Sequence, residues 1–196
     1  TSGSNVTLVD AGAIDLGAST VSGTYAVTAT ADGDITDSGV LAITGTSTLT
    51  AADEQSIILD QSSTFGTVAF VASSGNLKNV TINDSNALDL SALTLAQVSG
   101  AGGNLTVTAG GAVTDSGTLV IPGTTTISAS GQDVTLNDSS NNFGTATITG
   151  ANVAVTDTNA IALGASTISG TYSITADGNI TDDGAQVITG LTTLGA

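Results

Sequence analysis

Eight aspartates recur along the chain, each two residues after a branched aliphatic residue. Carboxylates supply the hard oxygen ligands that Ca²⁺ prefers, so a regular series of them could bind a series of ions. If the chain coils so that these positions stack, the protein carries a column of carboxylates along its length. The candidate metal ligands are therefore Asp10, Asp37, Asp60, Asp84, Asp115, Asp138, Asp157 and Asp182.

Two interpretations of these aspartates are open. Stacked carboxylates ~4.8 Å apart repel by roughly 3.5 kcal/mol per pair at an effective dielectric of about 20. In bulk water the same repulsion falls to about 0.9 kcal/mol, so the column needs either water or cations. The first interpretation is a ladder of Ca²⁺, about one ion per coil, completed by carbonyl, Asn or Ser oxygens. The alternative is a turn in which the carboxylate accepts the N–H two residues on. The residue type at these positions favours calcium. A turn would also accept Asn, Gly or Ser, yet all eight positions are aspartate.

The charge balance limits the possible partners. Seventeen acidic residues face one base, Lys78, which gives a net charge of −16. Nucleic acid and anionic membrane surfaces are therefore not expected as partners, whereas multivalent cations are. Cysteine is absent, so no disulfide can stabilise the chain. No apolar stretch approaches the length of a membrane-spanning helix, so membrane insertion is not expected either.

An enzyme is not expected. The sequence has no histidine, cysteine or arginine. A carboxylate pair could in principle hydrolyse glycosides, but the few aromatic residues stand at positions that face the core and offer no sugar platform. By parity the two tyrosines also face inward, with hydroxyls that could reach solvent. The five aromatic residues are Tyr25, Phe65, Phe70, Phe143 and Tyr172.

The chain is built from repeats. Asn5-Val6, Asn79-Val80 and Asn152-Val153 open similar passages, 74 and then 73 residues apart. Shorter units of 20–37 residues lie inside them, each with an apolar segment, an aliphatic-x-Asp segment and an apolar residue before glycine. Three short strands and turns fit such a unit, which predicts one coil of a parallel β-helix. The units start at Thr24, Thr46, Thr67, Asn104, Thr124, Thr145, Thr171 and Leu191.

We therefore predict one all-β domain over residues 1–196, a parallel β-solenoid of about eight coils with uncapped ends. Alternating segments such as Thr106-Val107-Thr108 favour strands over helix. The recurrent glycine is expected at a corner that needs positive φ or has no room for a side chain. The longest unit is expected to form loops around 73–78 and 92–103.

The repeats resemble a known family. The segments 110–117, 142–150 and 156–164 are similar to the repeats of giant filamentous-haemagglutinin-like exoproteins of bacteria. The resemblance covers nearly the whole chain. It implies a right-handed β-helix, export to the cell surface and a role in fibres or adhesion.

The ends suggest how copies could join. Residues 191–196 resemble the first strand of a coil, and residues 1–23 the second and third strands. A coil split between two copies would then be completed by head-to-tail assembly, or by flanking repeats of a longer chain. Unpaired strand edges favour such pairing. The candidate interface residues are Thr1, Val6, Leu8, Leu191, Leu194 and Ala196.

Three functions remain open. The first is a structural filament or stalk outside the cell, stabilised by the calcium ladder. The second is ice binding, because outward threonines on a flat face can form a regular array, although threonine is also a favoured exposed strand residue. The third is an adhesin fragment that binds a host or cell surface. The Thr-x-Thr pairs are Thr48/Thr50, Thr106/Thr108 and Thr147/Thr149, with Thr126/Ser128 close to the pattern.

Overall fold

A computed structural model describes all 196 residues, and it contains strands but no helix. No element therefore has the length and hydropathy of a membrane-spanning helix. The strands are β1 (Ser2–Gly3), β2 (Val6–Asp10), β3 (Ile14–Leu16), β4 (Ser19–Val21), β5 (Tyr25–Ala29), β6 (Ile35–Asp37), β7 (Leu41–Ala51), β8 (Ile57–Ala72), β9 (Asn79–Asp84), β10 (Leu88–Leu90), β11 (Leu93–Thr94), β12 (Gln97–Val98), β13 (Ala101–Gly102), β14 (Asn104–Ala109), β15 (Val113–Asp115), β16 (Leu119–Ser128), β17 (Val134–Leu136), β18 (Asn142–Gly150), β19 (Val153–Asp157), β20 (Ile161–Leu163), β21 (Ser166–Ile168), β22 (Tyr172–Ala176), β23 (Ile180–Asp182), β24 (Gln186–Ile188) and β25 (Thr192–Gly195).

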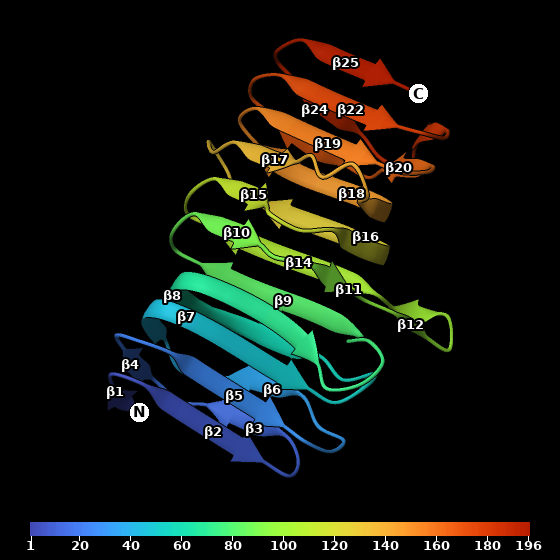
Figure 1. The fold of residues 1–196 in the computed structure, drawn as a ribbon. Helices are drawn as coiled ribbons and strands as arrows, with labels where there is room; N and C mark the ends of the chain where they lie inside the picture. Colours follow the sequence, from blue (N-terminus) through green and yellow to red (C-terminus); the bar gives the residue numbers. More distant parts are fainter.

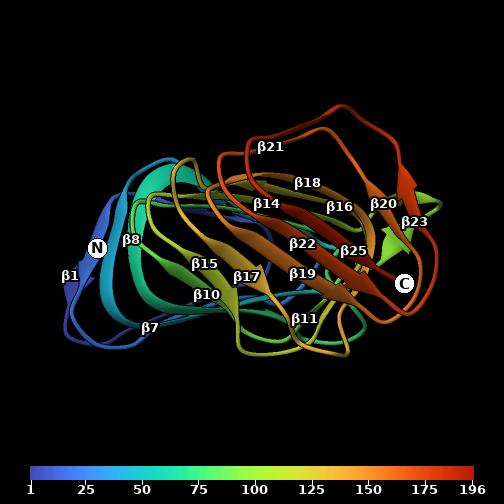
Figure 2. The same cartoon turned by 90° about the horizontal axis from the view of Figure 1, so that it is seen from above.

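The strands form a solenoid whose coils stack from the N-terminus to the C-terminus (Figure 1). β2, β3 and β4 make one coil, and each pairs in parallel with its counterpart in the next coil, β5, β6 and the start of β7. Seen along the axis, the chain winds in the right-handed sense (Figure 2). At ~4.8 Å per coil, the stack is roughly 43 Å long. The predicted all-β parallel solenoid is confirmed.

The solenoid has about nine turns, one more than the sequence predicts. Two of the repeating units contain four parallel strands instead of three. The unit from Thr67 contains the end of β8, then β9, β10 and β11. The unit from Thr145 contains the end of β18, then β19, β20 and β21. These extra strands account for the additional turn.

Because of the extra strand, corresponding strands of successive repeats lie on different faces of the solenoid, each repeat being shifted by one face from the repeat before it. β9 is the sequence counterpart of β2, yet it does not continue the β2–β5 face. It pairs instead with residues 57–59 of β8, which continue the β3–β6 face. The same step occurs at the next boundary, where β19 pairs with β17. Equivalent residues of successive repeats therefore lie on different sides of the rod.

The interior is filled by alternate residues of each strand. β5 and β19 both show buried residues at their first, third and fifth positions, as expected for one inward and one outward face. Burying one aliphatic side chain contributes about 1.5–3 kcal/mol, so the continuous core supplies the main stabilisation. All five aromatic residues are buried. Tyr25 and Tyr172 are each 1% exposed, so the prediction that their hydroxyls reach solvent is wrong.

The corners and loops explain the glycine pattern. A Cβ at Gly45 would collide with the carbonyl of Gly23 in the coil below, and Gly45 has no positive φ, so lack of room is the reason for glycine there. The predicted loop around 73–78 is confirmed, because no strand lies between β8 and β9. The loop around 92–103 is partly confirmed: β12 and β13 form an antiparallel hairpin that projects from the rod (Figure 1). Its turn has positive φ at Ser99 and Gly100, as in a type I′ turn.

The first coil differs from the prediction. β2 pairs with β5 as a long first strand, so residues 6–21 already contain all three strands of a coil. The prediction that residues 1–23 supply only second and third strands is therefore wrong. Among the candidate interface residues, Val6 and Leu8 are half-buried, and the other four are exposed: Thr1, Leu191, Leu194 and Ala196.

Candidate metal and surface-binding sites

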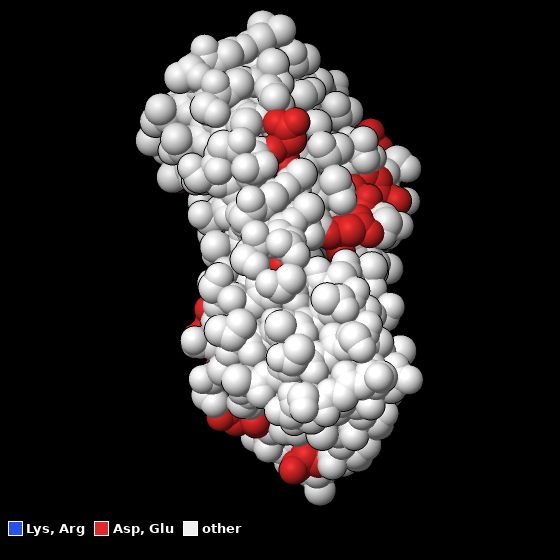
Figure 3. All heavy atoms as spheres, turned by 90° about the vertical axis from the view of Figure 1, so that its left-hand side faces the viewer, with Lys and Arg blue, Asp and Glu red and all other residues white.

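The predicted column of carboxylates is not present. The parallel register places each of six aspartates beside a residue that is not acidic: Asp10 beside Ala29, Asp37 beside Leu16, Asp84 beside Ala109, Asp115 beside Leu90, Asp157 beside Ala176 and Asp182 beside Leu163. On the face shown in Figure 3 the acidic atoms form separate patches, not a continuous line. The predicted register of Asp10, Asp37, Asp60, Asp84, Asp115, Asp138, Asp157 and Asp182 is therefore wrong.

Two structural features prevent the alignment. The rotation between repeats moves Asp10, Asp84 and Asp157, which are equivalent in sequence, onto different faces. Within a repeat, the aspartates also differ in their position along the strand. Ile35 pairs with Ile57, so Asp37 lies level with Leu59, and Asp60 falls one residue beyond. That offset reverses the direction of the side chain, because Asp37 is buried whereas Asp60 is exposed.

The turn interpretation is confirmed for five of the eight. In each, a carboxylate oxygen accepts the backbone N–H two residues on, at 2.8–3.3 Å. This hydrogen bond closes the turn that follows the strand. The five residues are Asp10, Asp84, Asp138, Asp157 and Asp182.

Several carboxylates also join neighbouring coils. Asp37 accepts the N–H of Asp60 at 2.8 Å, and Asp157 accepts the N–H of Phe143 at 2.6 Å. Asp115 accepts the N–H groups of Asn137 and Asp138, at 3.0 and 3.2 Å. These bonds satisfy backbone donors at corners where the ladder between strands is interrupted. Seven of the eight aspartates therefore act as turn or corner acceptors, whereas the Asp60 carboxylate accepts only from the side chain of Gln61.

Two of these carboxylates are buried and incompletely bonded. Asp37 is 7% exposed and Asp84 is 1% exposed, and the Oδ2 atom of each has no hydrogen-bond partner. Burial raises the pKa of both carboxyl groups, although hydrogen bonds from backbone N–H groups oppose the rise. No group of three or more acidic side chains has a geometry suited to a metal ion. The binding of Ca²⁺ stays a prediction, now without its expected column of ligands.

Asparagines at the repeat starts have a role that the sequence analysis missed. The side-chain oxygens of Asn5, Asn79 and Asn152 each accept a backbone N–H at the start of the next coil, from Thr24, Asn104 and Thr171, at 2.9–3.1 Å. Asn104 begins β14, and Thr24 and Thr171 directly precede β5 and β22. The signal was visible, because an asparagine directly precedes the first valine of every repeat.

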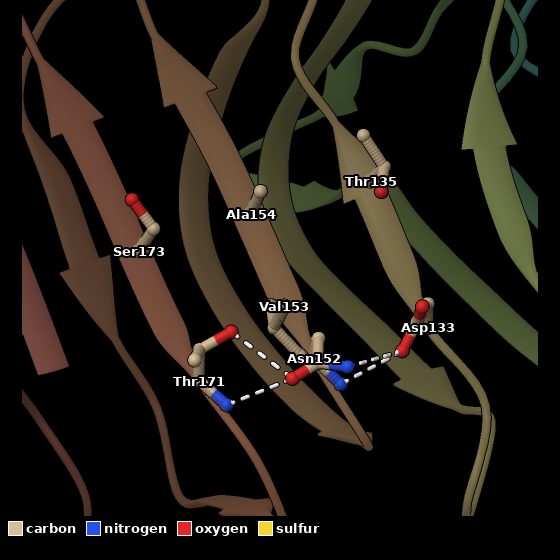
Figure 4. Close-up of a pocket in the computed structure, with 7 residues that line it drawn as sticks. All are labelled: Asp133, Thr135, Asn152, Val153, Ala154, Thr171 and Ser173. Carbon is tan, nitrogen blue, oxygen red and sulfur yellow. Dashed lines mark hydrogen bonds between the residues drawn. The ribbon is translucent and has the colours of Figure 1, made fainter. Parts of the chain in front are cut away.

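A shallow hollow lies beside one of these asparagines (Figure 4). Asn152 donates from its N–H and Nδ2 groups to Asp133 and accepts from Thr171. The small residues Ala154 and Ser173 leave the hollow open between β17, β19 and β22. At the corner, the Asp133 Oδ1 atom, the Asn152 side chain and the Thr171 N–H and hydroxyl are already engaged in bonds between coils.

The long strands form two extended outer faces. The first stack comprises residues 6–10, 25–29, 47–51 and 68–72, and the second stack comprises residues 79–84, 104–109, 124–128 and 145–149. In the first stack, the predicted Thr48/Thr50 pair is flanked by apolar residues: Thr48 lies between Ala26 and Ala69, and Thr50 lies beside Val71. In the second stack, the other predicted pairs come into register with one another. Two of its outward columns are Thr81, Thr106, Thr126 and Thr147, and Asn83, Thr108, Ser128 and Thr149.

The fold and these surfaces define a repeat protein of the parallel β-solenoid class. Its sequence matches the family described as "Repeats of unknown function (DUF5649)" over residues 3–72, 77–149 and 150–196. The match covers most of the chain in three copies, so the chain belongs to this family. Its first two boundaries also agree with the places where the structure rotates by one face. Comparison with curated proteins and with solved structures gives no match.

Proposed function

We propose that the chain is a structural segment of a filament or stalk outside the cell, of the filamentous-haemagglutinin-like kind. The carrying observation is a continuous apolar column that runs through the stacked coils to the edge of the last one. Leu194 continues the buried column of Val155 and Ile174 and is 53% exposed in this structure. Leu191 is 72% exposed beside it.

Such an edge suits another coil, from a second copy or from adjoining repeats. It carries unpaired N–H and C=O groups and apolar side chains, and both favour strand addition. Parallel pairing would bury Leu194 as it buries Ile174 one coil below, whereas Leu191 lies level with the exposed Thr171 and would stay at the rim of the contact. Burial of Leu194 would contribute about 1.5–3 kcal/mol to the association.

Replacing the two leucines tests this assembly. We expect the purified chain to form linear particles as its concentration rises, measured by light scattering and electron microscopy. The double variant Leu191→Lys with Leu194→Lys should remain monomeric, because the charge introduced at position 194 would be buried unpaired in the contact.

Val187→Lys is the matched control. Val187 lies in the same final turn and is 56% exposed, but it pairs with the outward Thr167, so it faces away from the coil edge. We expect this variant to assemble normally. A wild-type chain that stays monomeric at all concentrations, or an equal loss in both variants, would contradict assembly through this edge.

Adhesion to a host or cell surface remains a second candidate. The hairpin of β12 and β13 favours it, because it is the one antiparallel element projecting from the rod and could present a binding loop. Deleting residues 97–102 should then abolish binding to cells while leaving the melting temperature nearly unchanged. Unchanged cell binding would exclude the hairpin as the adhesive element.

A further inference from the structure

The second stack carries a regular array of neutral hydrogen-bonding groups. Register aligns Thr81, Thr106, Thr126 and Thr147 in one outward column. A parallel column contains Asn83, Thr108, Ser128 and Thr149. We call these eight residues the hydroxyl grid, since seven of them bear a hydroxyl group. The second column continues to Thr167 in the coil above.

The grid has a fixed two-dimensional spacing. Neighbouring coils are ~4.8 Å apart, and alternate residues of one strand are roughly 6.6 Å apart. Threonine side chains are restricted at χ1, so most of the hydroxyl and methyl groups hold their positions without a ligand. The interior side of these strands is closely packed, with Val107 and Ile127 at most 1% exposed. A rigid surface loses little entropy when it binds.

The chemistry of the grid excludes most kinds of partner. None of its residues is charged, and the one base of the protein, Lys78, lies outside it, so it cannot bind phosphate backbones. All five aromatic side chains are buried, so no ring is available to stack on sugars or bases. Protein interfaces depend mainly on Trp, Tyr and Arg anchors, which the grid lacks.

A periodic solid needs none of those anchors, since many weak contacts repeated at fixed intervals suffice. We propose that the hydroxyl grid binds the surface of ice. Water molecules of the crystal would occupy the troughs between threonine columns, accept or donate hydrogen bonds to the hydroxyls and pack against the methyl groups. This inference goes beyond the structural role and does not depend on end-to-end assembly.

The test compares matched positions in the two stacks. Thr106→Tyr with Thr126→Tyr replaces two central grid residues by bulky side chains that strands tolerate well. Ala26→Tyr with Thr48→Tyr makes the same change at the corresponding places of the first stack. Circular dichroism checks that each variant folds, and Thr106→Lys with Thr126→Lys replaces the grid variant if the tyrosines prevent folding.

The readout is thermal hysteresis, the gap between the melting and growth temperatures of an ice crystal in the protein solution. We expect a measurable gap for the wild-type chain and for the first-stack variant, and loss of the gap for the grid variant. Absence of hysteresis in the folded wild-type chain would overturn the proposal. So would an equal loss in both variants, or a gap that survives the grid substitutions.

The result is distinguishable from a failure of the filament proposal. The variant with Leu191→Lys and Leu194→Lys leaves the grid untouched, so it should retain hysteresis even as a monomer. Loss of hysteresis in that variant would show that the ice contact requires the assembled rod and not the grid of one chain.

Discussion

The first and second stacks are built from equivalent strands, yet they differ on their outer faces. Both place aliphatic residues inward, such as Leu49 and Ile127. Outward, the first stack alternates Thr7, Ala26, Thr48 and Ala69 in one column. The second stack has threonine at all four corresponding places. Packing therefore constrains only the inward half of each strand, and the outward half is free to carry a separate pattern.

The two stacks also lie on different sides of the rod. The four-strand units that begin at Thr67 and Thr145 break the three-strand period, so each repeat begins one face further round. A feature that recurs in every repeat is therefore displayed on successive sides. This arrangement explains why the acidic residues do not align over the length of the molecule.

Core truncation should affect both stacks equally and most strongly. Leu49→Ala and Ile127→Ala each remove a side chain that is at most 1% exposed. We expect each to lower the free energy of unfolding by about 2–5 kcal/mol, through lost burial and the cavity left behind. Urea denaturation measures the change. A much smaller effect in one stack would show that the interiors are not equivalent.

Filling a glycine corner should have the next largest effect. An added Cβ at Gly66 would meet backbone oxygens of Thr44 and Gly45, and one at Gly144 would meet those of Pro122 and Gly123. We expect Gly66→Ala and Gly144→Ala each to lower the free energy of unfolding by about 1–3 kcal/mol. Gly17→Ala is the control, because no atom lies within 4 Å of its added Cβ. Equal melting temperatures for all three variants would refute close packing at the corners.

The contribution of Asp84, at the end of β9, to the stability of the protein should depend on pH. Burial raises the pKa of Asp84 above 3.8, so the folded state retains this proton to a higher pH than the unfolded state. The stability gained from the neutral form is complete below the unfolded pKa and is lost as pH rises through the raised pKa. Asp84→Asn should therefore stabilise the protein at pH 7 relative to pH 4.

The size of this effect follows from the buried, unpartnered oxygen. We expect a relative gain of about 1–3 kcal/mol, the usual cost of leaving a buried polar group unsatisfied. Urea midpoints at the two pH values measure it. Asp10→Asn is the matched control, because Asp10 ends the corresponding strand of the first stack but is exposed. The same pH response in both variants would argue against burial as the cause.

Exchanging the outer faces should have the smallest effect on stability. Replacing Val9, Ala26, Ala69 and Val71 by threonine would make the two corresponding outward columns of the first stack entirely threonine. Each exposed or half-buried substitution should change the free energy of unfolding by no more than about 0.5 kcal/mol. If the hydroxyl grid binds ice, this variant should show increased thermal hysteresis. A large loss of stability would show that the outer residues also contribute to packing.

Much of the fold could be predicted because each coil repeats the same local pattern. The inward aliphatic residues, the corner glycines and the length of each unit were enough to indicate a parallel solenoid. The candidate metal site could not be predicted in the same way. Asp37 and Asp60 follow similar aliphatic segments, but one lies level with Leu59 and the other falls beyond it. That difference depends on pairing between coils, to which the local motif contributes nothing.

By itself, the sequence determined that strands would form, which residues would face inward and that the coils would repeat, since these follow from alternation and from burial of apolar side chains. Only the tertiary structure decided which residues of different coils are neighbours. The physical reason is that register is fixed by the number of strands traversed before the chain returns to a face. One extra strand in each of two units separated the aspartates, and the register within the second repeat aligned its threonines.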